Sequence, residues 1–252
     1  TGAAGGGPRV RRGGAVYVRA GQETGIAHAN VAEVFLVFAK TDPEKGAKGI
    51  TCFLVERGDG VKTSPLKGKL GLRAADTGMV FLDGVRVPKD RVLGKEGEGF
   101  RIALSTLDTG RISLAAGAVG LMQRALDLSL AYAGERKQFG KPIAQFQLVQ
   151  EHLAAMKLDL EAARLLTYRA AWKKVKGEPY TLEASLAKLF ASEAANRVAY
   201  RAIQVDGGYG FLEECEVARL YRDARILTLY EGTSEVQKLI IGAHLTGVRA
   251  FA

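Results

Sequence analysis

A carboxylate stands between an aromatic residue and a glycine in the run Leu229-Tyr230-Glu231-Gly232-Thr233-Ser234-Glu235. The apolar spacing that follows predicts a helix, through Val236, Leu239, Ile240 and Ala243. Ser234 and Gln237 are three residues apart and fit a capping box at the start of that helix. Glu231 would then lie on a loop that enters a helix, where free backbone N–H groups can bind anions. Such a carboxylate can act as a general base, and the simpler interpretation is a surface loop before an amphipathic helix.

The elements before residue 94 have the pattern of strands. Short runs rich in Val, Ile and Phe occupy residues 15–18, 31–39 and 50–56. Residues 79–82 and 85–87 flank Asp83-Gly84, a strong signal for a hairpin, and Pro88 then ends the pairing. We expect an antiparallel sheet in this part of the chain, built as a sandwich or as a barrel-like fold.

The elements after Gly99 have the pattern of helices. Apolar residues recur at spacings of three and four in 149–163 and 190–205. Glycines at 110, 134, 177 and 207–208 are expected to mark helix ends. Four or five helices with short connections predict an antiparallel bundle. The glycine-rich linker 94–99 separates a β domain, residues 1–93, from a helical domain, residues 94–252, so the fold class is α+β.

The composition of the chain excludes several function classes. Its 252 residues carry a net charge of +9, but the basic residues are spread along amphipathic helices, which does not favour nucleic acid. A phosphate-rich cofactor or a coenzyme A ester would use the same positive field. The two cysteines, Cys52 and Cys215, indicate reduced thiols in a cytosol-like compartment. The three histidines lack metal-ligand spacing, no segment is apolar for long enough to span a membrane, and the sequence shows no secretory signal pattern.

Seven short runs occur in one order in the second half of the sequence. They occupy residues 93–100, 107–111, 135–143, 146–147, 204–210, 221–225 and 230–235. Together they resemble the acyl-CoA dehydrogenase family, and residues 34–39, 49–56 and 69–71 match its strand region. The resemblance covers the family's middle β domain and C-terminal helical domain, but not its N-terminal helical domain.

The resemblance implies a reaction. Family members remove two hydrogens from the α and β carbons of an acyl-CoA thioester: a glutamate takes the α proton and FAD accepts the β hydrogen as hydride. Electrons then pass to an electron-transfer flavoprotein. Some members carry the base immediately before the arginine that is Arg111 here, whereas this chain has Gly110 in that position and keeps Glu231. The resemblance therefore implies Glu231 as the base, as in the short- and medium-chain members.

The resemblance also implies binding residues. Asp108, Arg111 and Gly232 match positions that contact the acyl-CoA. Positions that contact FAD match Ile26, Arg136, Gln138, Phe139, Phe146, Gln147, Gln204, Val205, Asp206, Gly207, Gly208, Thr233, Ser234 and Glu235. Structural alternatives exist, because Asp108 and Arg111 fit a surface pair at a helix start, Gly207-Gly208 fits a helix end and Ser234 fits a cap. The stretch at Arg136 reaches a neighbouring subunit in the family, which implies an oligomer. The resemblance suggests that this oligomer is a homotetramer built from two dimers.

Three departures leave alternatives open. Gly25-Ile26-Ala27 stands where the family has an aromatic residue, Ile and a hydroxyl residue against the flavin ring, and Gly7 replaces a serine. Asp206 stands where a less charged residue is usual. The protein would then bind flavin more weakly, or be a non-catalytic paralogue that binds acyl-CoA or a protein partner. A helical assembly protein is a third class, which does not require the seven runs. The compartment implied is the cytoplasm, or the mitochondrial matrix in a eukaryote.

Overall fold

The computed structural model describes residues 9–13, 15–19 and 21–250. The chain forms two compact units, residues 1–106 and 107–252, and their boundary falls inside a long helix. Each unit is described by itself. The predicted fold class, an antiparallel β region followed by a helical bundle, is confirmed, whereas a domain boundary at residues 93/94 stays a prediction.

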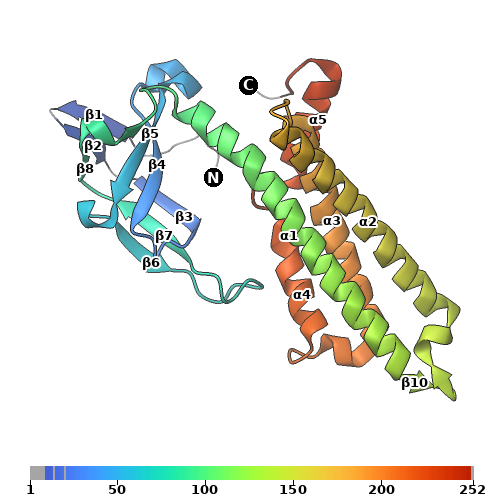
Figure 1. Ribbon diagram of the computed structural model, residues 1–252. Coiled ribbons are helices and arrows are strands. Elements are labelled where there is room, and N and C mark those ends of the chain that lie inside the picture. Colours follow the sequence, from blue (N-terminus) through green and yellow to red (C-terminus); the bar gives the residue numbers. More distant parts are fainter. Residues whose placement is uncertain (1–8, 14, 20, 251–252) are drawn as a thin grey trace. The chain divides into compact units, whose positions relative to one another are not determined.

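The first unit contains two sheets, labelled in Figure 1. The larger sheet has, in spatial order, β8 (Val85–Val87), β2 (Ala15–Arg19), β1 (Arg9–Gly13), β4 (Val34–Lys40), β5 (Ile50–Glu56) and β9 (Val92–Leu93). The smaller sheet has β3 (Gly21–Ala27), β7 (Thr77–Leu82) and β6 (Lys62–Pro65). The described pairings are antiparallel except that of β1 with β4.

Burial explains why these strands form a core. Alternate residues of β4 and β7 are buried, which is the period of a half-buried strand, while β5 is buried along most of its length. The shared core includes Phe35, Val37, Phe53, Val55, Val80, Leu82, Val85 and Val87.

The predicted hairpin at Asp83-Gly84 is wrong. A turn does occur there, with φ of +67° at Gly84, but β7 and β8 belong to different sheets. Both edges of β7 are occupied, by β3 and β6, so β8 pairs with β2 instead. The Asp83-Gly84 pair thus indicates only that the chain changes direction. Which strand β8 pairs with depends on which sheet edge is still free.

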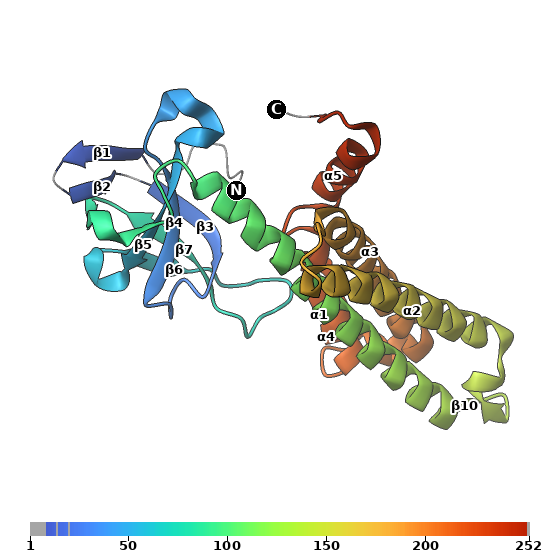
Figure 2. The same cartoon turned by 45° about the horizontal axis from the view of Figure 1, so that its top comes forward.

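The second unit is a helical bundle. Its helices are α1 (Gly99–Glu135, which begins in the first unit), α2 (Gln147–Val175), α3 (Thr181–Asp206), α4 (Glu216–Ala224) and α5 (Ser234–Thr246). Figures 1 and 2 show α1, α2 and α3 side by side. A short two-stranded element, β10 (Lys137–Gln138) and β11 (Lys141–Pro142), joins α1 to α2.

Small side chains let these helices approach closely. The face of α3 that is wholly buried consists largely of alanines, at positions 184, 187, 191, 194, 195, 199 and 202. Gly207, with φ of +64°, ends α3 as predicted. Gly110 does not mark a helix end, because α1 continues through it. Within the described part of the chain, no helix is long and apolar enough to cross a membrane.

Candidate active site

The turn before α5 holds Glu231 in an unusual backbone conformation. Glu231 has φ of +57° and Gly232 has φ of +88°. The left-handed region costs a residue with a side chain about 1–2 kcal/mol, so the surrounding contacts must maintain it. Gln237 Nε2 donates to the carbonyl oxygens of both residues, at 3.1 Å each, and Arg111 Nε donates to that of Glu231 at 3.3 Å. Strain of this kind is often found at functional sites.

The carboxylate of Glu231 lies directly against Gly110 of α1. A Cβ atom at position 110 would stand 2.4 Å from Glu231 Oε2 and 3.0 Å from Oε1. Glycine at this position therefore leaves the carboxylate its space, whereas the backbone conformation does not call for glycine, since the helix is regular there. Among the described residues, Glu231 Oε2 is buried and has no hydrogen-bond partner. This oxygen is thus free to receive a proton.

Opposing effects act on the acidity of Glu231. Burial raises the pKa of its carboxyl group above the ordinary value, whereas the positive charges of Arg111 and Lys188 lower it. Desolvation is the largest effect, so the pKa is raised. A base with a raised pKa binds a proton more strongly, which suits proton abstraction from a weak carbon acid.

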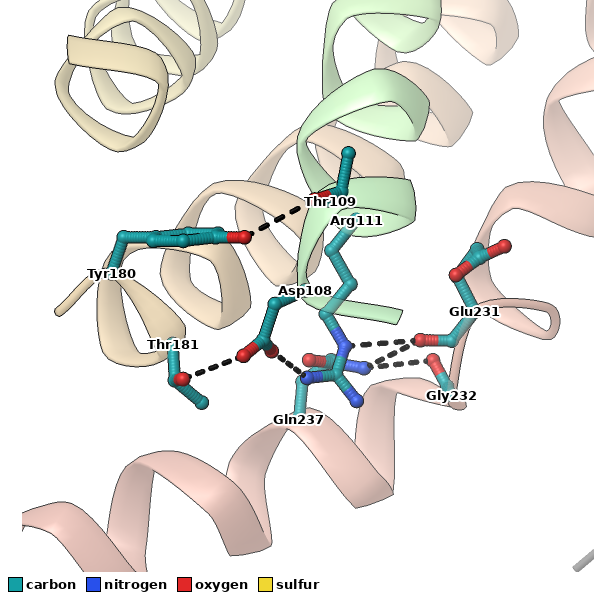
Figure 3. A network of polar contacts seen from close by, with 8 residues as sticks. All are labelled: Asp108, Thr109, Arg111, Tyr180, Thr181, Glu231, Gly232 and Gln237. Atoms are coloured by element: carbon teal, nitrogen blue, oxygen red, sulfur yellow. Dashed lines mark hydrogen bonds and ion pairs between the residues drawn. The ribbon is translucent and has the colours of Figure 1, made fainter. Parts of the chain in front are cut away.

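Arg111, on α1, connects the Glu231 turn to Asp108. It is only 4% exposed, and its Nη1 lies 2.8 Å from Asp108 Oδ1 in an ion pair. Asp108 in turn accepts a hydrogen bond of 2.6 Å from the Thr181 hydroxyl at the start of α3. Figure 3 shows the guanidinium facing the turn's carbonyl groups, while the carboxylate of Glu231 points away from it. The predicted roles of Asp108 and Arg111 toward a substrate stay predictions.

The start of α5 differs from the sequence prediction by one residue. The helix cap is Thr233, whose side chain accepts from the Val236 N–H, and not Ser234. Ser234 is 4% exposed and donates to Glu193 Oε1 of α3 at 2.5 Å. The predicted capping box is therefore wrong, because Gln237 is used to hold the turn. Glu235 lies exposed in the first turn of α5.

A second group of predicted residues lies at the other end of the bundle. Figure 1 shows β10 at the end of α1 away from α5. A pocket of about 400 Å³ there is lined by ten residues, among them Arg136, Gln138, Val205, Asp206, Gly207 and Gly208. Cβ atoms at either glycine would meet nothing within 4 Å, so both face open space. The Arg136 guanidinium stacks 5.9 Å from the ring centre of Tyr209.

Asp206 is the unexpected charge in this pocket. Its Oδ1 is buried without a hydrogen-bond partner among the described residues, and burial raises its pKa to about 6. At pH 7 the group is therefore still mostly ionised, and its negative charge would oppose a phosphate group bound beside it.

The remaining predicted residues are distributed around these two groups. Phe139 and Phe146 form an edge-to-face pair with ring centres 6.0 Å apart, and Gln147 begins α2. Gln204 is exposed on the last turn of α3. Ile26 belongs to the first unit and packs partly against its sheet core. Gly7 lies outside the described residues.

Comparison with known proteins decides the family. Residues 97–246 match the acyl-CoA dehydrogenase C-terminal domain, and residues 8–85 match the acyl-CoA dehydrogenase middle domain. The chain belongs to the acyl-CoA dehydrogenase family. It is 46% identical over 94% of its length to the mitochondrial short-chain specific acyl-CoA dehydrogenase of Bos taurus.

Two further proteins are similar to this member of the acyl-CoA dehydrogenase family. CarC, a subunit of the caffeyl-CoA reductase-Etf complex of Acetobacterium woodii, is 42% identical over 92% of the chain. The solved structure of butyryl-CoA dehydrogenase from Megasphaera elsdenii has a TM-score of 0.93 and 42% identity over 96% of the chain. The chain spans 58% of the length of the Bos taurus protein, 62% of CarC and 64% of the M. elsdenii chain.

Two residues of this candidate site were missed by the sequence interpretation. Gln237 was assigned to a helix cap, although it holds the Glu231 turn. Lys188 was not considered, although it is fully buried and its Nζ donates to the Gly232 carbonyl at 2.7 Å. The signal for Lys188 was its position, three residues before Ala191 and seven before Ala195, in the buried stripe of α3.

Proposed function

We propose that the protein removes two hydrogens from an acyl-CoA thioester in an FAD-dependent reaction, with Glu231 as the base. One observation carries the proposal. The carboxyl group of Glu231 has a raised pKa, its Oε2 is buried without a hydrogen-bond partner among the described residues, and it lies against Gly110, where a Cβ atom would displace it. The family membership supports the same assignment, because Gly110 occupies the alternative position of the base.

The residues at the far end of the bundle fit a dinucleotide. The fork of donors on Arg136 suits a pyrophosphate. Gly207 and Gly208 leave open the space that side chains would fill, so a ligand can approach the backbone there. We propose that these residues, with Gln138 and the edge-to-face pair of Phe139 and Phe146, hold part of FAD, and that Thr233 and Glu235 contact FAD near Glu231.

The chain's own residues divide the work of proton abstraction. Glu231 takes the proton from the α carbon, and the C–H bonding electrons become the new α,β double bond as the β hydrogen leaves with its electron pair. FAD, when bound, supplies the acceptor for that hydride. Arg111 and Gln237 keep the turn in place, and Gly110 leaves the carboxylate its position. Partial burial, which removes water from Oε2, strengthens the carboxylate as a base.

Distance along α1 supports an assembly of at least two copies. Arg111, beside the base, and Arg136, in the pocket, are about 25 residues apart, which corresponds to about 37 Å of helix. That exceeds the reach of one dinucleotide, so a cofactor reacting at Glu231 of one copy requires the Arg136 pocket of another. We extend this proposal to a homotetramer of two dimers. We also propose an electron-transfer flavoprotein as the electron acceptor and a cytoplasmic or mitochondrial location.

Reduction of an unsaturated acyl-CoA is a second candidate, because CarC, a subunit of a reductase complex, is 42% identical to this chain. The same residues would serve in reverse, with Glu231 returning the proton to the α carbon. The visible spectrum of the full-length protein tests both candidates. Butyryl-CoA should bleach the absorbance of oxidised flavin, and crotonyl-CoA should restore it in the chemically reduced protein. A colourless protein that does not take up FAD would refute both and favour a non-catalytic paralogue.

A further inference from the structure

Lys188 is a charged residue in a place where lysine is rarely found. It lies on α3, is 0% exposed, and is surrounded by the alanine-rich core of the bundle. Burying an ammonium group costs free energy unless specific contacts compensate. Within the part of the chain that the structure describes, no carboxylate lies within ion-pair distance of Lys188, and its Nζ hydrogen bond goes to the Gly232 carbonyl at 2.7 Å.

Three donors from three helices meet on the two carbonyl groups of the turn. Arg111 from α1 and Gln237 from α5 contact the carbonyl of Glu231, while Gln237 and Lys188 from α3 contact that of Gly232. The contact of Lys188 is the shortest of the four and is made by a charged donor, so it is the strongest.

We propose that Lys188 is a positioning residue for Glu231, whose ammonium group fixes the Gly232 carbonyl and thereby holds the carboxylate over Gly110. This inference rests on the proposed function for its effect on turnover, but not for its effect on the geometry of the turn. Without the contact, the left-handed conformation of Glu231 would lose a main restraint and the carboxylate would leave its place.

The charge of Lys188 has a second consequence. Burial, followed by repulsion from Arg111, lowers the pKa of Lys188 to about 8, while Glu193, Glu231 and Glu235 act in the opposite direction. Lys188 is therefore still charged at neutral pH, and together with Arg111 it lowers the pKa of Glu231. The charge of Lys188 thus adds to the larger effect of Arg111 in favouring the ionised form of Glu231, which is the form that accepts a proton.

Two substitutions separate the hydrogen bond from the charge. Lys188→Met removes both, whereas Lys188→Gln keeps a donor and removes only the charge. Lys173→Met is the matched control, because Lys173 forms an ion pair with the buried Glu183 in the same bundle and does not touch the turn. Each full-length variant is compared with the unmodified protein in thermal unfolding, in kcat and KM with butyryl-CoA, and in the pH titration of Glu231. That titration is followed by difference infrared spectroscopy and assigned by its loss in Glu231→Gln.

The expected result for Lys188→Met is a kcat lower by about 10²-fold, the cost of a displacement of about 1 Å. KM should change little. Lys188→Gln should recover part of kcat, and Glu231 should titrate at higher pH in both variants. Normal kcat and an unchanged Glu231 titration in Lys188→Met, with a loss of thermal stability like that of Lys173→Met, would overturn the proposal. A Lys188→Gln variant as slow as Lys188→Met would refute the role of the donor.

Three possible outcomes keep the conclusions distinct. If Lys188→Met does not fold, Lys188→Gln carries the test through the infrared titration alone. If the unmodified protein does not react with butyryl-CoA, the proposed function fails on that substrate, while the infrared titration of Glu231 still decides the role of Lys188. If Glu231→Gln is inactive and Lys188→Met turns over normally, only the inference about Lys188 fails.

Discussion

Gly110→Ala should separate stability from activity. Replacing a glycine inside α1 by alanine improves helix propensity by about 1 kcal/mol. The new methyl carbon would stand 2.4 Å from Glu231 Oε2, whereas carbon contacts are ordinarily about 3.5 Å or longer. The carboxylate must therefore retreat by about 1 Å. It is the end of a flexible side chain, so this retreat costs less than a backbone movement would.

The expected outcome is a protein as stable as the original or slightly more so. A gain of 1 kcal/mol corresponds to a rise of roughly 2–4 °C in Tm for a chain of this size. Turnover should nevertheless fall by about 10²-fold, the cost of an ångström of misplacement. In activation free energy this loss is about 3 kcal/mol.

The assay is thermal unfolding together with kcat and KM for butyryl-CoA. Gly117→Ala is the matched control, because Gly117 lies in the same helix and a Cβ atom there meets nothing within 4 Å. It should give the gain in stability without the loss of activity. The reasoning is refuted if Gly110→Ala turns over like the unmodified protein, since the carboxylate would then not need its place over Gly110. A large loss of Tm confined to Gly110→Ala would show that the clash spreads into the bundle.

Three further outcomes follow from the charges in the helical unit. Glu231→Gln should lower kcat by roughly 10²–10⁴-fold. Because the pKa of Glu231 is higher in the folded than in the unfolded state, ionisation of Glu231 destabilises the fold as pH rises past the unfolded value. The variant should therefore have a higher Tm than the unmodified protein at pH 7 and the same Tm well below pH 4.5. Equal gains in Tm at both pH values would contradict this. Arg111→Met leaves Asp108 without its buried partner and should lower the free energy of unfolding, measured with denaturant, by roughly 3–5 kcal/mol. A loss below about 1 kcal/mol would show that the ion pair does not hold the site together. Asp206→Asn should stabilise the protein increasingly between pH 4 and 6 and keep that gain above pH 6, because burial raises the pKa of Asp206 to about 6. Measurement of Tm from pH 4 to 8 checks this. A gain in Tm at pH 4 as large as that at pH 7 would be the contrary result.

Local patterns predicted the elements but not their partners. The range of β5 was predicted residue for residue, because a run of apolar residues identifies a buried strand directly. The pairing of β8 was not predicted, since it depends on the edges that β3 and β6 leave free. Gly110 was predicted both to mark a helix end and, from the resemblance, to leave space for Glu231; the helix continues through it, and the Glu231 carboxylate lies beside it.

The sequence by itself determined the fold class and the family, and it supplied the prediction that Glu231 is the base. These depend on the order of short runs and on periodicity, which are properties of the chain. Only the tertiary structure decided what surrounds Glu231. Gly110, Lys188 and Gln237 lie on three helices and meet at one turn. Periodicity tells which face of each helix is buried, but not which atoms of another helix it meets, because that depends on how all the helices pack together.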